Sequence, residues 1–205
     1  MAAQLDFKFA NSSDTPPSPS STSFQLTTHP STDIWRKPGP PKIEAFNAPI
    51  LYKSLPLSSF QRVRVTVSAN WSTLYDQGGL VFILPSSSDG TRKWIKSGVE
   101  FYQNEAYVST VVADRWADWS LVQTGFRDGK EVTLEFERNK AEETLWIYVI
   151  DGEKRVPIRE VTWILSEGVE KECWVGIYAA KPTASAAGKE RGLVVNFTGW
   201  ELDII

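Results

Sequence analysis

The 205-residue chain contains one cysteine, Cys173, and one histidine, His29. A single cysteine cannot form an intramolecular disulfide, and a chain of this length does not need one, because folding buries roughly 70% of its unfolded surface. His29 has no cysteine or acidic cluster at metal-ligand spacing around it. We therefore expect no metal, no cofactor and no Ser-His-Asp catalytic site.

Long apolar runs and a strong net charge are also absent. No segment approaches the ~20 apolar residues that a membrane-spanning helix requires, and the amino terminus lacks both a basic segment and an apolar run of signal-peptide length. The formal net charge is −3, and lysine and arginine are scattered, so the electrostatic pattern of a nucleic-acid binder is missing. These absences predict a cytoplasmic protein whose partners are neither membranes nor nucleic acids.

Aromatic residues, in contrast, are abundant: the chain has nine tryptophans, six tyrosines and ten phenylalanines. Segments rich in β-branched and aromatic residues recur at short intervals with turn residues between them, which is typical of a β-sandwich or barrel. The expected strands span residues 5–9, 24–28, 50–54, 60–70, 74–84, 93–102, 106–113, 119–123, 131–137, 144–150, 156–163, 173–180 and 193–204. No stretch predicts a helix, so we expect a single all-β domain over residues 1–205.

Loops and turns are predicted from proline, glycine and serine. Residues 11–23 are rich in Ser, Pro and Thr and are predicted to form an exposed, mobile loop, and the Pro/Gly cluster at residues 37–42 marks a second irregular connection. Asp-Gly is a favoured pair for two-residue hairpins. Such pairs occur at Asp89-Gly90, Asp128-Gly129 and Asp151-Gly152.

Alternating side chains leave opposite faces of a strand, and three segments combine an apolar face with an aromatic and polar one. These segments are residues 93–102, 144–150 and 173–180. We predict that Trp94, Trp146 and Trp174 lie on one shared second face. That face is either solvated or covered by loops such as 11–23, or it is a concave site whose rings stack on a flat ligand.

Four blocks of residues, in order, resemble the regulation-of-enolase type proteins, a family of largely uncharacterised function. The blocks are IWRK at 34–37, LYDQGGL at 74–80, WIKSGVEF at 94–101 and DWS at 118–120. The resemblance implies a concanavalin A-like jelly-roll sandwich of two antiparallel sheets, a fold also seen as an accessory domain in β-xylosidases. It further implies a lectin-like protein with a carbohydrate or small metabolite as ligand, and a protein partner in central carbon metabolism.

Glucanases with the implied fold carry Glu-x-Asp-x-x-Glu on one strand, and a retaining hydrolase needs two carboxyl groups about 5–5.5 Å apart. The nearest match is Glu201-Leu202-Asp203, which places two carboxylates on one strand face but lacks the third acid. We expect no catalytic pair there.

The blocks that carry the resemblance supply the candidate ligand-binding residues. These are Trp35, Arg36, Tyr75, Asp76, Gln77, Trp94, Lys96, Glu100 and Trp119. Lys96 and Glu100 lie roughly 13 Å apart along one strand, so each needs a partner on a neighbouring strand. Arg36 is expected to pair with Asp76 or Glu100. The set is either a salt-bridge network that ties the amino-terminal segment across the sheet or the polar floor of a groove.

Gly78 and Gly79 interrupt an otherwise apolar strand. We expect them either to leave a gap above the sheet or to permit a β-bulge, so that a ligand or a neighbouring tryptophan can approach the backbone.

Two functions fit these residues. One is a non-catalytic binding or regulatory protein with a groove for a carbohydrate or sugar-like metabolite. The alternative is a cofactor-independent isomerase, lyase or cyclase that uses Lys96, Glu100 or Asp76 for proton transfer, because burial can shift such groups toward neutral pKa values. A third hypothesis is that the protein's own loops fill the face. A closed pocket with an acid of raised pKa favours the enzyme, and a shallow groove favours the binding protein.

Overall fold

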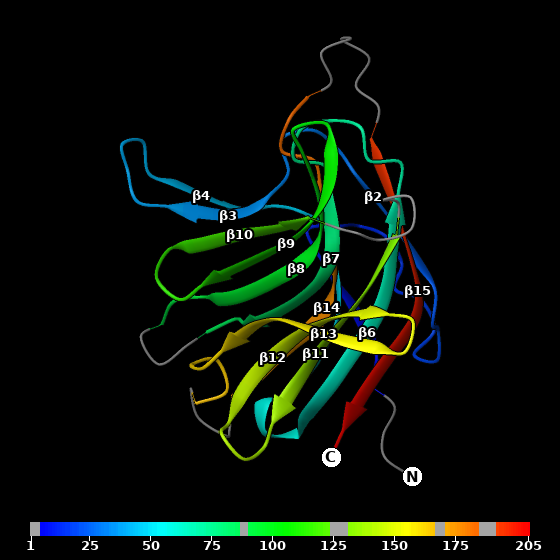
Figure 1. Ribbon diagram of the computed structural model, residues 1–205, viewed down its shortest axis with the longest axis vertical. Coiled ribbons are helices and arrows are strands. Elements are labelled where there is room, and N and C mark those ends of the chain that lie inside the picture. Colours follow the sequence, from blue (N-terminus) through cyan, green and yellow to red (C-terminus); the bar gives the residue numbers. More distant parts are fainter. Residues whose placement is uncertain (1–4, 87–89, 124–130, 167–170, 185–191) are drawn as a thin grey trace.

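The computed structural model describes residues 5–86, 90–123, 131–166, 171–184 and 192–205 (Figure 1). Within these ranges it consists of fifteen strands and one short 3-10 turn, η1 (Leu57–Ser59). The strands are β1 Phe7–Ala10, β2 Phe24–Thr28, β3 Ile34–Lys37, β4 Ile43–Phe46, β5 Ile50–Pro56, β6 Phe60–Ala69, β7 Gln77–Leu84, β8 Lys93–Tyr102, β9 Glu105–Ala113, β10 Ala117–Gln123, β11 Glu131–Asn139, β12 Thr144–Asp151, β13 Lys154–Val161, β14 Glu172–Ala180 and β15 Leu193–Ile204.

Most strands belong to two large antiparallel sheets. The first has seven strands in the order β1-β5-β14-β7-β8-β9-β10, and the second has six in the order β13-β12-β11-β6-β15-β2. The two sheets pack face to face as a sandwich (Figure 1). The predicted all-β fold with two antiparallel sheets is confirmed.

The main core lies between the sheets and follows directly from alternation along each strand. In β6, for example, Val63, Val65 and Val67 are fully buried, whereas Arg64 and Thr66 between them are only partly buried. Burying a side chain of this size contributes roughly 1.5–3 kcal/mol to folding. A sheet with one apolar and one polar face therefore has one stable orientation, with its valines toward the opposite sheet.

A two-stranded sheet, β3–β4, covers part of the other face of the seven-stranded sheet. In Figure 1 this hairpin projects beside β10. Ile34 of β3 is fully buried in a second apolar cluster that also contains Trp94 and Tyr178. β7 lies between β14 and β8, and all eight of its residues are buried. No strands were predicted at 34–37 and 43–46, the two segments that flank the Pro/Gly cluster.

The three segments predicted to share an aromatic face lie in different sheets. β8 and β14 belong to the seven-stranded sheet, where Trp94 and Trp174 pack in the second cluster. β12 belongs to the six-stranded sheet, and there Trp146 stacks beside Tyr148 with ring centroids 6.1 Å apart. The prediction of one shared face was wrong, because alternation assigns side chains to a face of a strand but does not assign the strand to a sheet.

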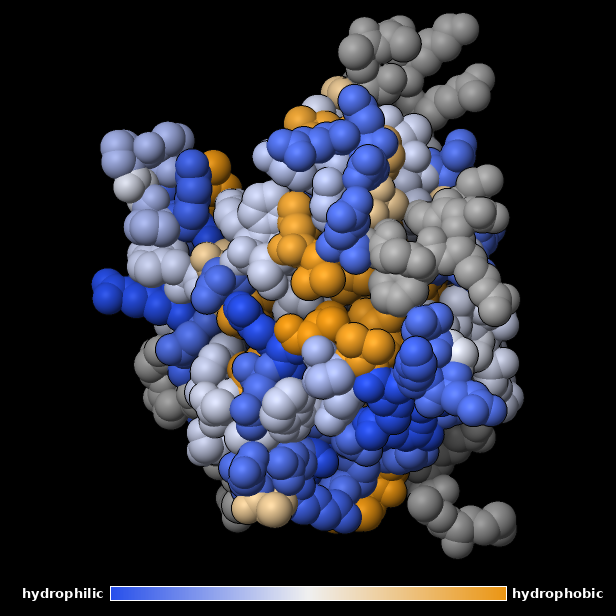
Figure 2. Space-filling model, viewed as in Figure 1, coloured by the Kyte–Doolittle hydropathy of each residue, from blue (hydrophilic) through white to orange (hydrophobic). Residues whose placement is uncertain are grey.

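The outer face of the six-stranded sheet carries a network of ion pairs centred on Glu135. This carboxylate is fully buried and accepts hydrogen bonds from Arg62, Arg64 and Arg155. Burial raises the pKa of Glu135, but the hydrogen bonds from Arg155, Arg64 and Arg62 outweigh it and hold the pKa below its ordinary value. Figure 2 shows strongly hydrophilic residues low on the viewed face, around β6 and β13.

The carboxylates of Glu201 and Asp203 belong to the same network. They lie on one face of β15, as predicted, and each accepts a hydrogen bond from Arg62 at 2.8 Å. This position is on the opposite sheet from the second apolar cluster. Both carboxylates thus pair with an arginine in a surface network.

One predicted Asp-Gly turn can be compared with the structure. Asp151 pairs with Lys154, so the two loop residues of the β12–β13 hairpin are Gly152 and Glu153, one position later than predicted. Gly152 has a φ of +60°, which glycine adopts without strain. The pair Asp128-Gly129 and residue Asp89 lie outside the described residues.

The Ser/Pro-rich segment 11–23 connects β1 to β2 and has bonds to both large sheets. The Trp200 amide donates to the Thr22 carbonyl at 3.0 Å, and Lys53 Nζ donates to the Pro19 carbonyl at 2.9 Å. The segment that covers the aromatic face of the seven-stranded sheet is instead the β3–β4 hairpin.

Candidate ligand pocket

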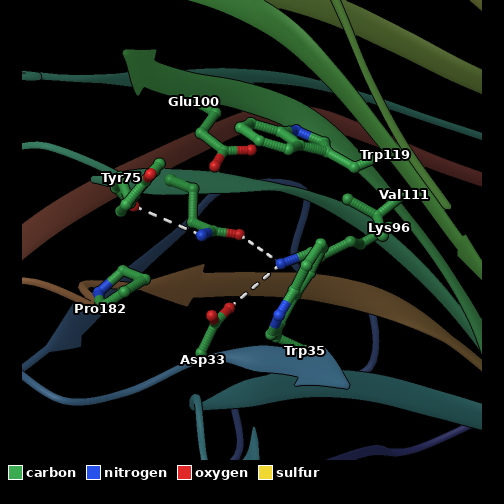
Figure 3. Close-up of a pocket in the computed structure, with 9 residues that line it drawn as sticks. Asp33, Trp35, Tyr75, Lys96, Glu100, Val111, Trp119 and Pro182 are labelled. Atoms are coloured by element: carbon green, nitrogen blue, oxygen red, sulfur yellow. Dashed lines mark hydrogen bonds and ion pairs between the residues drawn. The ribbon is translucent and has the colours of Figure 1, made fainter. Parts of the chain in front are cut away.

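A pocket of about 260 Å³ opens on the seven-stranded sheet beside the β3–β4 hairpin (Figure 3). Strands β7, β8, β9 and β10 form its floor, and residues at the start of β3 and after β14 form walls. The lining residues are Asp33, Trp35, Tyr75, Gln77, Lys96, Glu100, Val111, Trp119 and Pro182. Six of the nine predicted site residues are among them.

Lys96 is the central polar group of the pocket. Its side chain is only 3% exposed, and its Nζ lies 3.1 Å from Asp33 Oδ1. The same ammonium donates to Gln77 Oε1 at 2.6 Å, and the Gln77 amide donates to the Tyr75 carbonyl at 3.3 Å (Figure 3). Lys96 therefore takes its partners from β7 and from the residue before β3, in agreement with the expectation that it needs a partner on a neighbouring strand.

Glu100 is the second buried ionisable group, with 5% of the residue exposed. Its Oε2 accepts a hydrogen bond from Ser109 Oγ at 2.6 Å, and Trp119 Nε1 donates to the same Ser109 oxygen at 3.1 Å. Burial raises the pKa of Glu100, and this effect outweighs the lowering by the Lys96 charge and by the Ser109 hydrogen bond. The carboxyl group is thereby shifted toward the protonated form.

Aromatic rings surround this polar floor. Trp119 has its ring centroid 6.2 Å from Trp35, 6.3 Å from Tyr75 and 5.8 Å from Tyr102, in edge-to-face arrangements. Tyr75 is held in the left-handed region with a φ of +65°, a conformation that costs a non-glycine residue of order 1–3 kcal/mol. Its amide donates to the Phe101 carbonyl at 2.7 Å, which fixes this backbone against β8.

Asp76 points away from the pocket, although Tyr75 and Gln77 on either side of it line the wall. Its carboxylate is 2.8 Å from Lys181 Nζ, and both side chains are buried. It also accepts a hydrogen bond from the Thr73 amide at 2.9 Å. The prediction that Asp76 binds ligand has no support in this geometry, because its charge is used inside the protein.

Arg36 and Trp94 do not line the pocket either, and both contact other parts of the protein. Arg36 donates to the carbonyl oxygens of Ala113 and Asp114 at 3.1 and 2.6 Å, which ties the β3–β4 hairpin to the end of β9. The predicted pairing with Asp76 or Glu100 was wrong. Neighbouring residues of a strand point to opposite faces, so with Trp35 in the pocket Arg36 faces the other way.

Trp94 is 2% exposed and packs in the second apolar cluster. It lies two residues before Lys96 in β8, on the same face of the strand, where the hairpin covers the sheet. It therefore supports the pocket from beneath the hairpin and does not line it.

The glycines of β7 neither open a gap nor form a bulge. The β7–β8 register runs without interruption through the Gly79–Gly98 pair. A Cβ atom on Gly98 would lie 2.0 Å from the Gly78 carbonyl oxygen, and one on Gly79 would lie 2.2 Å from the Ser97 carbonyl oxygen. The glycines therefore allow two strand backbones to approach closely, and the interpretation as a ligand gap or a bulge was wrong.

Sequence reasoning missed three lining residues and one supporting residue. The lining residues are Asp33, Val111 and Pro182, and the supporting residue is Ser109, which connects Glu100 to Trp119. Asp33 directly precedes the IWRK block, and this position in the sequence could have identified it as a pocket residue. Nothing in the local pattern around Pro182 or Ser109 indicates that their strands meet the same pocket.

Other reactive groups are few in the described ranges. No cluster of three or more His, Cys, Asp or Glu residues there is arranged to hold a metal ion. The thiol of Cys173 is buried, and burial raises its pKa to about 12, so it stays protonated at neutral pH. None of the helices in the described part has the length and apolar character needed to cross a membrane.

Two comparisons at the level of sequence find matches that cover most of the chain. The family model described as "Protein of unknown function (DUF1349)" matches residues 10–204. The uncharacterized protein AN7484 of Emericella nidulans is 50% identical over 181 residues, which cover 88% of this chain and 86% of that protein.

Two solved structures show the same fold. A functionally unknown protein from Saccharomyces cerevisiae has a TM-score of 0.76 at 23% identity, covering 98% of this chain and 97% of that chain. A mutant of the GH43 protein BlXynB from Bacillus licheniformis has a TM-score of 0.58 at 16% identity, covering 89% of this chain and 33% of that chain. The fold is thus that of jelly-roll-like β-sandwich proteins.

Proposed function

The chain belongs to the DUF1349 family of proteins of unknown function, and we propose that it binds a carbohydrate or sugar-like metabolite in the pocket beside the β3–β4 hairpin. The observation that carries this proposal is the combination of three aromatic lining residues, Trp35, Tyr75 and Trp119, with polar lining residues that supply one ammonium and two carboxyl groups. Rings offer a surface for the apolar face of a sugar, while the floor offers hydrogen bonds to its hydroxyl groups.

The hydrogen-bond donors and acceptors of the pocket residues suit a polyol as ligand. Lys96 has three N–H donors and uses two of them on Asp33 and Gln77, so the third is available to a hydroxyl oxygen. The carboxyl groups of Asp33 and Glu100 can accept hydrogen bonds from hydroxyl groups. The volume of about 260 Å³ is close to the lower end of ligand sites, roughly 300–1,000 Å³, and suits one small ring.

The family resemblance noted from the sequence extends the proposal to a biological role. We propose a non-catalytic, regulatory protein of the cytosol that senses a sugar or a related metabolite and acts on a protein partner in central carbon metabolism. Occupation of the pocket next to the β3–β4 hairpin would then alter the surface that such a partner contacts.

One observation favours a second candidate function, a cofactor-independent isomerase, lyase or cyclase. Burial raises the pKa of Glu100, and Lys96 lines the same pocket, so the site holds an acid and a cation suited to proton transfer. Asp76, the other acid considered, is paired with Lys181 behind the wall. The enzyme hypothesis therefore depends on Glu100 and Lys96.

A thermal-shift screen with a matched control tests the binding proposal. The wild type, Trp119→Ala and Trp146→Ala are each heated with sugars, sugar phosphates, oligosaccharides and glycolytic metabolites. A ligand at a hundredfold excess over its Kd stabilises the native state by about 2.7 kcal/mol. We expect a rise in Tm for the wild type and for Trp146→Ala, whose indole lies on the six-stranded sheet, and no rise for Trp119→Ala.

Equal shifts in both variants, or no shift for any compound, would contradict binding in this pocket. Turnover is then assayed by following the NMR spectrum of the bound compound over time with the wild type and with Glu100→Gln. Conversion by the wild type that Glu100→Gln abolishes would establish the enzyme, and an unchanged spectrum would favour the binding protein.

A further inference from the structure

Aromatic rings continue beyond the pocket as a connected strip. Trp35, Trp119, Tyr102 and Tyr107 follow one another, with successive ring centroids 6.2, 5.8 and 6.4 Å apart. Only the two tryptophans line the pocket. The strip therefore begins inside the pocket and ends on a surface outside it.

Strand geometry places the two tyrosines on the same face of the sheet as the pocket floor. Tyr102 is separated from Glu100 by one residue in β8, and Tyr107 is four residues from the lining residue Val111 in β9, so each pair shares a strand face. Tyr107 also pairs directly across from Glu100 in the β8–β9 register. The β3–β4 hairpin packs over Trp94 at the other end of β8, and Tyr102 and Tyr107 are each partly exposed.

The two tyrosines differ from core aromatics in their surroundings. Both are partly exposed, and the Tyr107 hydroxyl lies 3.4 Å from Glu105 Oε2 in an exposed hydrogen bond. Large rings that are connected, partly exposed and continuous with a pocket form an extended surface with apolar faces and polar edges. Such a surface suits a ligand that is itself a chain of rings with apolar faces and hydroxyl edges.

We propose that Tyr102 and Tyr107 form a second subsite and that the ligand is a neutral oligosaccharide, with its terminal unit in the pocket and the following units stacked on the tyrosines. This inference rests on the proposed function. A neutral chain is favoured because the Lys96 ammonium is already paired with Asp33, and because the Glu105 carboxylate lies beside Tyr107. A uronate or a sugar phosphate stacked on Tyr107 would meet the like charge of Glu105.

The test measures affinity against chain length by isothermal titration calorimetry. The probes are glucose, xylose and mannose, each as the monosaccharide and as its β-linked disaccharide and trisaccharide. The proteins are the wild type, Tyr107→Ala, Tyr107→Phe and the control Tyr148→Ala, whose ring lies on the six-stranded sheet. For the wild type, Tyr107→Phe and Tyr148→Ala we expect the affinity of one series to rise roughly tenfold from one unit to three, since a stacked aromatic contact contributes of that order. Tyr107→Ala should lose this rise and keep the affinity for one unit.

The outcomes separate the two proposals. Binding of a single unit without any gain from additional units, or a gain that persists in Tyr107→Ala, overturns the second subsite and leaves the pocket intact. Absence of binding for every probe overturns the second subsite together with the proposed function. Tighter binding of glucuronate or glucose 6-phosphate than of glucose would contradict the neutral ligand.

Discussion

Replacing Lys181 by methionine would test the buried ion pair that stands behind the pocket wall. Lys181 Nζ lies 2.8 Å from Asp76 Oδ1, and the two side chains are 4% and 1% exposed. Removing the ammonium leaves a buried carboxylate that still accepts hydrogen bonds from the Ser72 and Thr73 amides. Removing one partner of a buried ion pair costs about 3–5 kcal/mol of unfolding free energy. Because the two amides still hydrogen-bond to the carboxylate, we expect a loss of about 3 kcal/mol.

Urea unfolding of three variants would measure this effect. Lys181→Met alone should lose about 3 kcal/mol of unfolding free energy, whereas Asp76→Asn/Lys181→Met should recover most of the loss, because no uncompensated charge is left and the amide oxygen still accepts from the backbone. Lys42→Met, which breaks an exposed pair with Glu44, should change stability by less than ~1 kcal/mol. A single variant as stable as the wild type, or a double variant less stable than the single one, would refute this reasoning.

Two further substitutions address the pocket floor. Because burial raises the pKa of Glu100 above its ordinary value of 4.5, its contribution to stability is complete below that pH and is lost as the pH rises through the folded-state pKa. Glu100→Gln should therefore be more stable than the wild type at pH 7.5 and equal to it near pH 4, as measured by urea unfolding; a less stable variant at pH 7.5 would contradict this sign. Gly98→Ala should lose about 3 kcal/mol in thermal unfolding, because its Cβ would lie 2.0 Å from the Gly78 oxygen, and an unchanged Tm would show that the strands can separate.

Most strands of the sandwich were predictable because they are long enough to show alternation. In β6 and β11 valine, leucine and phenylalanine alternate with charged residues, and the two-sheet core follows from that pattern. The β3–β4 hairpin was not predictable in this way. Its strands have four residues each, and their stability comes from contacts of Ile34 with the second apolar cluster, which are remote in sequence.

The pocket was predictable where its residues lie in recognised blocks. Lys96, Gln77 and Glu100 were identified because they are polar residues in the blocks LYDQGGL and WIKSGVEF, which carry the family resemblance. Their hydrogen-bond partners Asp33 and Ser109 were not identified. These residues come from other segments, and the whole fold determines which strands are neighbours in the sheet.

Asp76 shows that residue type alone does not identify a ligand-binding residue. A charged residue between two pocket residues looks like a ligand-binding group, and only the position of Lys181 reveals that its charge is used internally.

The burial of β7 on both faces has a consequence for how the pocket responds to a ligand. Every residue of β7 is buried, and the strand is hydrogen-bonded to β14 on one side and to β8 on the other. Amides in such a position exchange with solvent mainly through global unfolding. Gln77 and its partner Lys96 therefore lie on buried, doubly paired strands, and a ligand that binds them loses little affinity to ordering the protein.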